Sequence, residues 1–362
     1  MKKTTLIILL LLVLTTVFAQ TEPNLKKAQN YLNTKGEVIF TFKAANQQQF
    51  KKLAGFLSIS HKRVDPQDLK VEAYADKEAF QKFLKYNIPF EVSTTDNEIP
   101  SEENKSALAP NAQWDTSWDA YPTYSQYVAK MQYYATTYPN LCKLENIGST
   151  PNGRNLYILK ISDNCQSDEA EPEFFYSSSM HGDEITGFPL MMRLIDYLVT
   201  RYGTDTEVTN LVNTTEIYIS PLSNPDGSFK TAGNDVMNSA GNAATRANAN
   251  GRDLNRNYPD PVNGLHSDTF AYQPETLAFL AFEKTRNFVL AANFHGGVEV
   301  VNYPWDAYSS PNHLHPHDNH FKFIAKNYAQ SCQTASNNNG YMDDVFASQF
   351  PGTTNGSLWY TV

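Results

Sequence analysis

From about residue 114 onward, short apolar segments alternate with longer segments whose apolar residues recur at helical spacing, and few folds accommodate that order. Such alternation predicts an α/β fold, in which a mostly parallel or mixed sheet is covered by helices on both faces. The predicted elements are strand Glu173 to Ser178, helix Glu184 to Tyr202, strand Glu216 to Pro221, helix Thr276 to Arg286 and strand Phe288 to Phe294. Active sites in such sheets lie where strands end, so the residues that follow each strand are the first candidates for chemistry.

A second, smaller α/β pattern precedes this one, over residues 36–94. Its predicted strands and helices are Glu37 to Lys43, Gln47 to Leu57, Leu69 to Tyr74, Lys77 to Tyr86 and Phe90 to Ser93. Both helices carry an apolar stripe on one face, as helices that pack on a small sheet do. Residues 95–113 are polar and acidic, which is typical of a linker. The sequence therefore predicts a small N-terminal domain, either a propeptide or a plain docking domain, and a second domain over residues 114–362.

Residues 1–19 have the pattern of a secretory signal peptide. Lys2 and Lys3 precede an apolar stretch from Leu6 to Leu14, and small residues suit cleavage after Ala19. The alternative is a membrane anchor, but a spanning helix needs about 20 apolar residues and this stretch is shorter. The sequence therefore predicts a secreted or periplasmic protein that is not attached to the membrane once the signal is removed.

The charge pattern limits the partners of this chain. The formal net charge is −9, and no block of basic residues occurs along the sequence. Binding to a phosphate backbone needs clustered Lys and Arg. Nucleic acid is therefore not a predicted partner.

Three cysteines, Cys142, Cys165 and Cys332, are too few for a disulfide scaffold. Two apparent strands, Leu144 to Gly148 and Leu156 to Ser162, are joined by a turn and would form a hairpin. Folding this hairpin brings Cys142 and Cys165 to the same end. The sequence leaves open whether the two are bridged, and a bridge between them would leave Cys332 unpaired.

The first candidate for chemistry is the segment His181-Gly-Asp-Glu184, which follows the strand that ends at Ser178. A histidine and an acid three residues apart have the spacing of zinc ligands. Among the eight histidines of the chain, about one such pair is expected by chance. Taken alone, the pair is therefore better explained as an ordinary hydrogen-bonded histidine.

His295 supports the metal interpretation, because it ends the apolar strand Phe288 to Phe294. Two strand ends can meet at one edge of a sheet. Three protein ligands with one position open to water form the pattern of catalytic zinc, whereas structural zinc takes a fourth side chain. The sequence thus favours a catalytic metal site.

A loop rich in Gly, Asn and Arg, from Arg246 to Asp260, lies between these pieces. Surface charges are the simpler interpretation of its arginines. However, Asn255 beside Arg256 could bind a carboxylate bidentately. An enzyme that recognises a free peptide terminus needs such a pair.

Seven segments between about Trp118 and Val362 together carry a resemblance to a known family. They are His181-Gly-Asp-Glu184, Asn224-Pro-Asp-Gly227, Asp253-Leu-Asn-Arg-Asn-Tyr-Pro-Asp260, Gln273-Pro-Glu-Thr276, Phe294-His-Gly-Gly297, Val300-Val-Asn-Tyr-Pro304 and Thr354-Asn-Gly-Ser-Leu-Trp-Tyr360. With them this stretch resembles the zinc metallocarboxypeptidase family, most closely the branch of carboxypeptidases D, N, E and M. The resemblance implies the fold of that family, a central mixed eight-stranded sheet flanked by helices, here without its C-terminal end.

By position, the resemblance implies one Zn²⁺ ion with His181, Glu184 and His295 as its ligands. Asp253 matches the acid that orients the first zinc histidine. The metal site would therefore be formed by residues from three separate segments of the chain.

The resemblance also implies a site for the C-terminus of a peptide or protein. Asn255 and Arg256 match the pair that holds the terminal carboxylate of the substrate. Arg246 matches the arginine that polarises the scissile carbonyl and stabilises its oxyanion. Asp306, eleven residues after His295, matches the acid that attracts a basic terminal side chain in this branch, so we expect specificity for Lys or Arg.

The predicted function is that of a secreted zinc metallocarboxypeptidase, which removes the last residue of a peptide by zinc-promoted attack of water. The resemblance also implies a catalytic Tyr and Glu well downstream of Thr354 to Tyr360, so we expect the general base to lie beyond residue 362. Two other functions are open. One is a zinc-dependent deacylase of acylated amino acids or cell-wall peptides, and the other is an exported, non-catalytic module that binds zinc and peptide termini.

Other polar residues are weaker candidates. A run of histidines at positions 313, 315, 317 and 320 could bind metal, but a surface loop at the start of a helix is the preferred interpretation. Glu299 lies near His295 in sequence but within a strand, so we do not expect it to replace the missing base. Arg252 has no role implied by the resemblance and is expected on the surface.

Overall fold

The computed structural model describes residues 22–34, 36–54, 56–59, 68–93, 118, 121–237, 244–259, 270–296, 301–304, 314–337 and 353–355. The chain divides into two compact units. The first contains Met1–Thr95, Pro259–Asp268 and Gly297–Val362, and the second contains Asp96–Tyr258 and Thr269–Gly296. The predicted signal peptide and the predicted linker lie outside the described residues.

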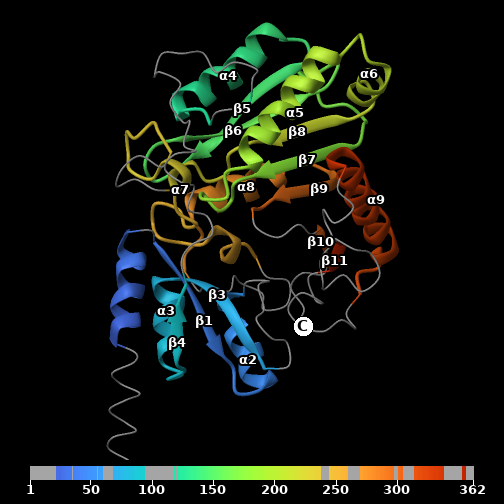
Figure 1. The fold of residues 1–362 in the computed structure, drawn as a ribbon. Coiled ribbons are helices and arrows are strands. Elements are labelled where there is room, and N and C mark those ends of the chain that lie inside the picture. Colours follow the sequence, from blue (N-terminus) through green and yellow to red (C-terminus); the bar gives the residue numbers. More distant parts are fainter. Residues whose placement is uncertain are drawn as a thin grey trace, which may run out of the picture. The chain divides into compact units, whose positions relative to one another are not determined.

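The N-terminal part of the first unit is a small antiparallel sheet with helices (Figure 1). The strand order is β2-β3-β1-β4. The elements are a helix over residues 22–34, β1 (Glu37–Lys43), α2 (Gln47–Ala54), β2 (Ser58–Ile59), β3 (Lys70–Asp76), α3 (Lys77–Leu84) and β4 (Phe90–Val92). The predicted strands and helices of this region are confirmed, whereas the first helix and β2 were not predicted.

Aromatic side chains fill the core of this sheet. The ring of Phe40 lies 4.6 Å from that of Phe83 and 5.2 Å from that of Phe80, measured between centroids. All three side chains are fully buried. Asp76 caps α3, since its carboxylate accepts a hydrogen bond from Ala79 N at 2.8 Å. The remaining elements of the unit are β10 (Val301–Tyr303) and β11 (Thr353–Asn355), which pair in parallel, and α9 (Asp318–Ser336).

The second unit is built on a mixed sheet with the strand order β5-β6-β8-β7-β9. Its strands are β5 (Cys142–Ser149), β6 (Asn155–Ile161), β7 (Glu173–Ser178), β8 (Glu216–Ser220) and β9 (Phe288–Phe294). β7 pairs in parallel with β8 and β9, whereas β5, β6 and β8 pair antiparallel. The predicted α/β class with a mixed sheet is confirmed. The resemblance implied eight strands, and the described residues contribute five.

Helices cover both faces of this sheet, as the sequence predicts (Figure 1). Successive residues of a strand point to opposite faces, and β6 shows this clearly. Leu159 packs with residues of α4 (Tyr124–Thr137), α5 (Gly187–Arg201) and α6 (Thr206–Val212) in one core cluster. Ile158 packs in another cluster with residues of α8 (Pro274–Glu283). The strand is therefore buried on both sides, which accounts for its nearly continuous apolar sequence.

The pairing of β7 with β9 determines where chemistry can occur. The two strands run parallel, and their last residues, Ser178 and Phe294, are paired in the register. The segments that follow them therefore leave the sheet side by side. Helix α5 begins at Gly187, three residues later than predicted, because Ser179 takes a left-handed φ of 55° and the chain turns through residues 179–186 first.

Cys142 and Cys165 are both buried and are free thiols in the structure, as is Cys332. The possible bridge is therefore not formed. Cys165 Sγ donates a hydrogen bond to Pro139 O at 3.4 Å. Burial raises the pKa of Cys142 to about 12, so this thiol stays protonated at neutral pH.

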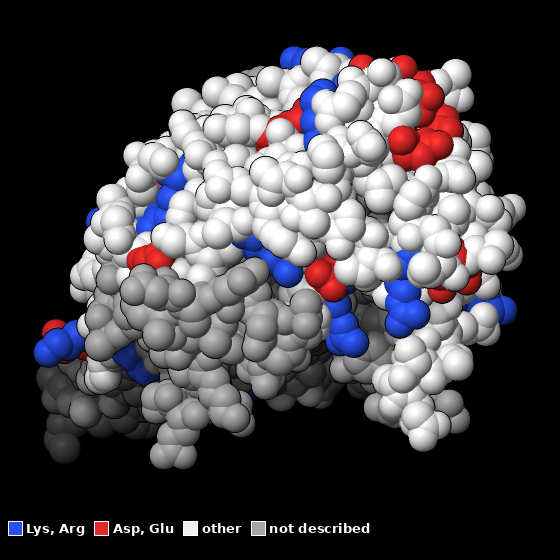
Figure 2. Space-filling view, turned by 90° about the horizontal axis from the view of Figure 1, so that it is seen from above, with Lys and Arg blue, Asp and Glu red and all other residues white. Residues whose placement is uncertain are grey.

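Most of the described surface on the face shown in Figure 2 is uncharged, and Lys and Arg lie on it in small, separate groups. Among the described residues, no helix has both the length and the apolarity needed to cross a bilayer. The apolar stretch at the start of the chain belongs to the residues that are not described.

Candidate metal site

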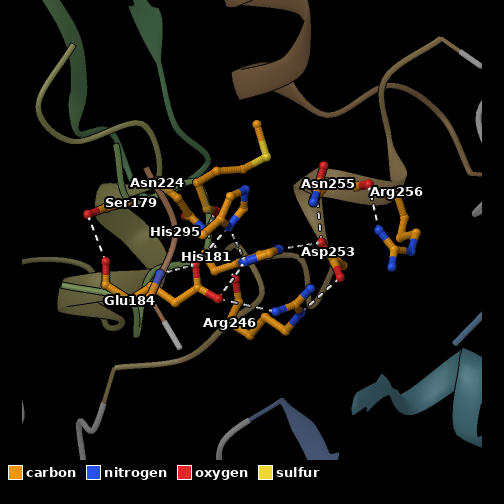
Figure 3. Close-up of polar contacts among 11 residues, drawn as sticks. Ser179, His181, Glu184, Asn224, Arg246, Asp253, Asn255, Arg256 and His295 are labelled. Atoms are coloured by element: carbon orange, nitrogen blue, oxygen red, sulfur yellow. Dashed lines mark hydrogen bonds and ion pairs between the residues drawn. The ribbon is translucent and has the colours of Figure 1, made fainter. Parts of the chain in front are cut away.

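Three side chains meet just beyond the ends of β7 and β9 (Figure 3). His181 and Glu184 belong to the loop after β7, and His295 directly follows β9. Their donor atoms all lie within 4.8 Å of one another. Glu184 Oε1 is 2.9 Å from His181 Nδ1, and Glu184 Oε2 is 2.8 Å from His295 Nδ1. The structure thus brings together the three residues that the sequence singled out as metal ligands.

The hydrogen bonds of His181 show which ring nitrogen faces the other two side chains. Nε2 lies 3.1 Å from Asp253 Oδ1. An ionised carboxylate only accepts hydrogen bonds, so Nε2 carries a proton, and Nδ1 is the nitrogen that faces Glu184 and His295. His295 Nδ1 lies 3.0 Å from this nitrogen. Two ring nitrogens this close to each other and to a carboxylate require a proton or a cation between them.

This set of donors fits zinc. Two imidazoles and one carboxylate are preferred zinc ligands, and three protein ligands leave a position open in catalytic sites. The His181 and Glu184 side chains are only 3% and 8% exposed, whereas the His295 side chain is 31% exposed. The group is therefore accessible from the His295 side.

Charged residues around the group hold its acids in the ionised form. Arg246 Nε donates to Asp253 Oδ2 at 3.0 Å, and Arg246 Nη1 donates to Glu184 Oε1 at 3.5 Å. Burial alone would raise the pKa of Asp253, but Arg246 and His181 hold that pKa well below its ordinary value. Burial likewise opposes ionisation of Glu184, and His181 and His295 lower its pKa well below the usual range. Asp253 thus joins His181 to Arg246.

The residues predicted to bind a peptide terminus lie on the same loop but outside this group. Asn255 and Arg256 form the short helix η1 (Leu254–Arg256), which begins with a hydrogen bond from Asn255 N to Asp253 Oδ1 at 2.9 Å. Arg256 extends away from His181 in Figure 3, and its Nη1 donates to Asn255 O at 3.0 Å. Asp306 lies outside the described residues.

Arg252 is not simply a solvated charge. Its guanidinium carbon lies 3.1 Å from the centroid of the Phe270 ring. Stacking of a guanidinium on an aromatic face is a favourable cation–π contact. Arg252 is partly exposed, so the contact with Phe270 adds to the expected surface position and does not contradict it.

The zinc carboxypeptidase family profile matches residues 127–362, which is well over half of the chain. The chain belongs to the zinc carboxypeptidase family. The resemblance seen in the sequence is thereby confirmed. Zinc is the cofactor of this family, and the donor set of His181, Glu184 and His295 fits that ion.

Individual carboxypeptidases are similar to this chain over about two thirds of its length. Carboxypeptidase D of Mus musculus is 40% identical over 238 residues, which cover 63% of this chain and 16% of that protein. Carboxypeptidase M of Mus musculus is 38% identical over 236 residues, covering 62% of this chain and 51% of that protein. The carboxypeptidase N catalytic chain of Rattus norvegicus is 35% identical over 254 residues, covering 62% of this chain and 54% of that protein. This chain thus spans about half, or less, of the length of these relatives.

Solved structures support the same fold. Carboxypeptidase A from Helicoverpa armigera has a TM-score of 0.60 at 20% identity, covering 91% of this chain and 83% of that one. Thrombin activatable fibrinolysis inhibitor has a TM-score of 0.58 at 16% identity, covering 90% of this chain and 84% of that one. Both structural matches cover a larger share of this chain than residues 127–362 do. The structural similarity therefore extends to residues that precede the family match.

Buried hydrogen bonds anchor the loop that carries Arg246 and Asp253. Asn248 Nδ2 donates to Gln273 Oε1 at 3.1 Å and to Glu275 Oε2 at 3.0 Å. Its Oδ1 accepts from Arg252 N at 3.0 Å. In the sequence, Gln273 and Glu275 stood out only as part of a family motif. Nothing in the local pattern indicates that the start of α8 is hydrogen-bonded to the distant loop that contains Asn248.

The histidine run does not form a second metal site among the described residues. The rings of His315 and His317 lie 5.5 Å apart at the start of α9, and His313 is not described. Besides the zinc group, only Asp163, Glu169 and Glu171 lie close enough together in the described part of the chain to hold an ion. Acidic groups of this kind are common on protein surfaces and carry no assignment here.

Proposed function

We propose that this protein is a metallocarboxypeptidase, which hydrolyses the last peptide bond of its substrates with zinc held by His181, Glu184 and His295. The observation that carries the proposal is the meeting of these three side chains at two adjacent strand ends. Family membership supports the reaction, and the donor set supports the metal.

Zinc, when bound, lowers the pKa of a water molecule and polarises the carbonyl of the scissile bond. Asp253 accepts a hydrogen bond from Nε2–H of His181 and so keeps the opposite nitrogen available as a ligand. The guanidinium of Arg246 lies beside the proposed zinc ligand Glu184, so it would lie close to the carbonyl oxygen of a substrate at the metal, which becomes an oxyanion during hydrolysis. We assign Arg246 to stabilise that oxyanion.

Asn255 and Arg256 are proposed to hold the terminal carboxylate of the substrate. A carboxypeptidase must bind this carboxylate one residue away from the scissile bond, which is about 3.5 Å of extended chain. Groups that bind it therefore belong beside the metal site, and η1 follows Asp253 directly. Arginine and asparagine side chains suit a carboxylate because they donate paired hydrogen bonds.

Asp306 is proposed to attract the side chain of a terminal Lys or Arg, a role that rests on the sequence resemblance. The pattern of residues 1–19 supports export, so we propose that the protein acts outside the cytoplasm, in the periplasm or after secretion, on the C-termini of peptides or proteins. We also propose that residues 36–94 form a separate small domain, either a propeptide or a docking domain, with a linker at residues 95–113.

Measurement of bound zinc tests the proposal most directly. The wild-type protein is expected to hold about one zinc ion per chain, and His295→Ala is expected to lose most of it. His317→Ala is the control, because His317 lies at the N-cap of α9 and is not among the three grouped donors. Zinc retained by His295→Ala, or lost equally by both variants, would refute the site.

Substrate tests then separate the possible reactions. A metallocarboxypeptidase should cleave a peptide that ends in Arg and should not cleave the same peptide with an amidated C-terminus. Hydrolysis of acylated amino acids alone would indicate a deacylase. Zinc-dependent binding of the free peptide without cleavage would indicate a binding module.

A further inference from the structure

The turn that contains α7 (Pro225–Phe229) lies directly against the metal-binding loop. A Cβ atom on Gly182 would lie 2.2 Å from the carbonyl carbon of Gly227, so the two backbones are in contact. Ser228 Oγ donates to Gly182 O at 2.7 Å, and this hydrogen bond is buried. Asn224 begins the turn, and its Oδ1 accepts from Gly227 N at 2.8 Å.

The amide of Asn224 also reaches the metal-binding loop and the Arg246 segment (Figure 3). Its Nδ2 donates to Met180 O, the carbonyl that precedes His181, at 3.1 Å. The same nitrogen donates to Arg246 O at 3.4 Å. That carbonyl also accepts a hydrogen bond from Gly182 N at 3.3 Å. Asn224 is completely buried, so water cannot replace these bonds.

We infer that Asn224 is a positioning residue, whose amide fixes the backbone of the metal-binding loop relative to the backbone of Arg246. The inference deepens the proposed function and rests on it, since it concerns the zinc site and the arginine used there. An oxyanion is stabilised only by donors held at the correct distance. The hydrogen bonds of Asn224 supply that constraint, because they join the metal-binding loop and the Arg246 segment to the turn that contains α7.

The chemistry of the amide explains why asparagine is needed. The residue must accept one hydrogen bond from Gly227 N and donate two through Nδ2. Among short side chains, only an amide offers an acceptor and two N–H donors. Aspartate has the same shape and is a good N-cap, but it would direct a carboxylate oxygen at two carbonyl oxygens.

Two variants and one matched control test this role. Asn224→Asp keeps the shape and the N-cap acceptor but removes both donors, and Asn224→Ser removes them without adding charge. The control is Asn234→Asp. Asn234 Nδ2 also donates to two backbone carbonyls, Phe229 O at 2.6 Å and Val236 O at 2.7 Å, and neither belongs to the metal-binding loop.

Hydrogen exchange of the metal-free protein gives the first measurement. Both Asn224 variants are expected to accelerate amide exchange on the order of tenfold in residues 179–184 and in residues 245–248 together, because buried hydrogen bonds are lost in both segments. Asn234→Asp should accelerate exchange only around residues 229–237. Acceleration in just one of the two segments, or the same pattern in the control, would overturn the inference.

Metal binding gives the second measurement. Zinc affinity, measured by competition with a chelator, is expected to fall about 10- to 100-fold in both Asn224 variants, as when partners of metal ligands are removed. The visible spectrum of the cobalt-substituted protein should change in the same variants and not in Asn234→Asp. An unchanged affinity and spectrum would overturn the inference. Wild-type protein that binds no zinc would refute the proposed function, while the exchange pattern would still decide the role of Asn224.

Discussion

Asp253 makes contacts that no other side chain of the site combines. One carboxylate oxygen lies 3.1 Å from His181 Nε2, and the other accepts from Arg246 Nε at 3.0 Å. Its side chain also caps the start of η1, since Oδ1 accepts a hydrogen bond from Asn255 N. One acid thus orients the metal ligand, the arginine and the turn that is proposed to bind the peptide terminus.

Asp253→Asn is expected to weaken zinc binding by about 10- to 100-fold, because the amide retains the shape but loses the charge that favours the Nε2–H tautomer of His181. Chelator competition measures this change. Asp235→Asn is the control, since Asp235 accepts two hydrogen bonds from Ser125, at 2.7 and 2.9 Å, and lies outside the metal group. An affinity equal to that of wild type would show that Asp253 does not support the ligand.

The grouping of the three proposed zinc ligands could be predicted from the sequence because each follows the end of an apolar strand. Strand ends are visible in one sequence, and parallel pairing then brings His181 and His295 together. Asn224 could not be predicted in its positioning role. Its partners, Met180 and Arg246, are 44 and 22 residues away, and the local pattern of Asn followed by Pro indicates only a helix start.

At the scale of elements, the start of α8 anchors the loop that carries Arg246. Glu275 is fully buried in the first turn of this helix, and its Oε2 accepts from Asn248 Nδ2. Burial raises the pKa of Glu275, although the hydrogen bond from Asn248 acts in the opposite direction. An acid with a raised pKa binds its proton more tightly in the folded protein than in the unfolded one. Its ionisation therefore destabilises the fold as pH rises.

Glu275→Gln is accordingly expected to stabilise the protein relative to wild type, by an amount that grows as pH rises above about 4.5 and becomes constant once Glu275 is ionised in the folded protein. The glutamine keeps an acceptor for Asn248 and removes the titrating group. Thermal unfolding at several pH values measures the effect. Glu207→Gln, which replaces an exposed acid in the first turn of α6 by the same substitution, is the control. A constant or shrinking difference for Glu275→Gln would contradict the buried-acid interpretation.

The extent of the elements was less predictable than their order. The first residue of α5, Gly187, packs tightly onto the end of β7, since a Cβ there would lie 2.2 Å from Ser178 Oγ. This contact depends on tertiary structure and leaves no mark in helical periodicity. The short strand β2 was missed because two residues cannot show the alternation that indicates a strand.

At the scale of the whole molecule, the two units have separate cores. The core of the small antiparallel sheet is formed by residues between Ala28 and Val92, whereas the mixed sheet is covered by clusters between Tyr127 and Phe282. All three proposed zinc ligands belong to the second unit. They bind from two different strand ends, so zinc should hold β7 and β9 together at the edge where they pair.

A ligand that binds only the folded state stabilises it by about 2.7 kcal/mol when its free concentration is 100 times the dissociation constant. Zinc is therefore expected to slow amide exchange in β7 and β9 and to leave exchange in β1 and β3 unchanged. Exchange measured with and without a chelator tests this, and His295→Ala should remove the zinc effect. Equal protection of β1 would mean that both units unfold as one, and no protection of β9 would place the metal elsewhere.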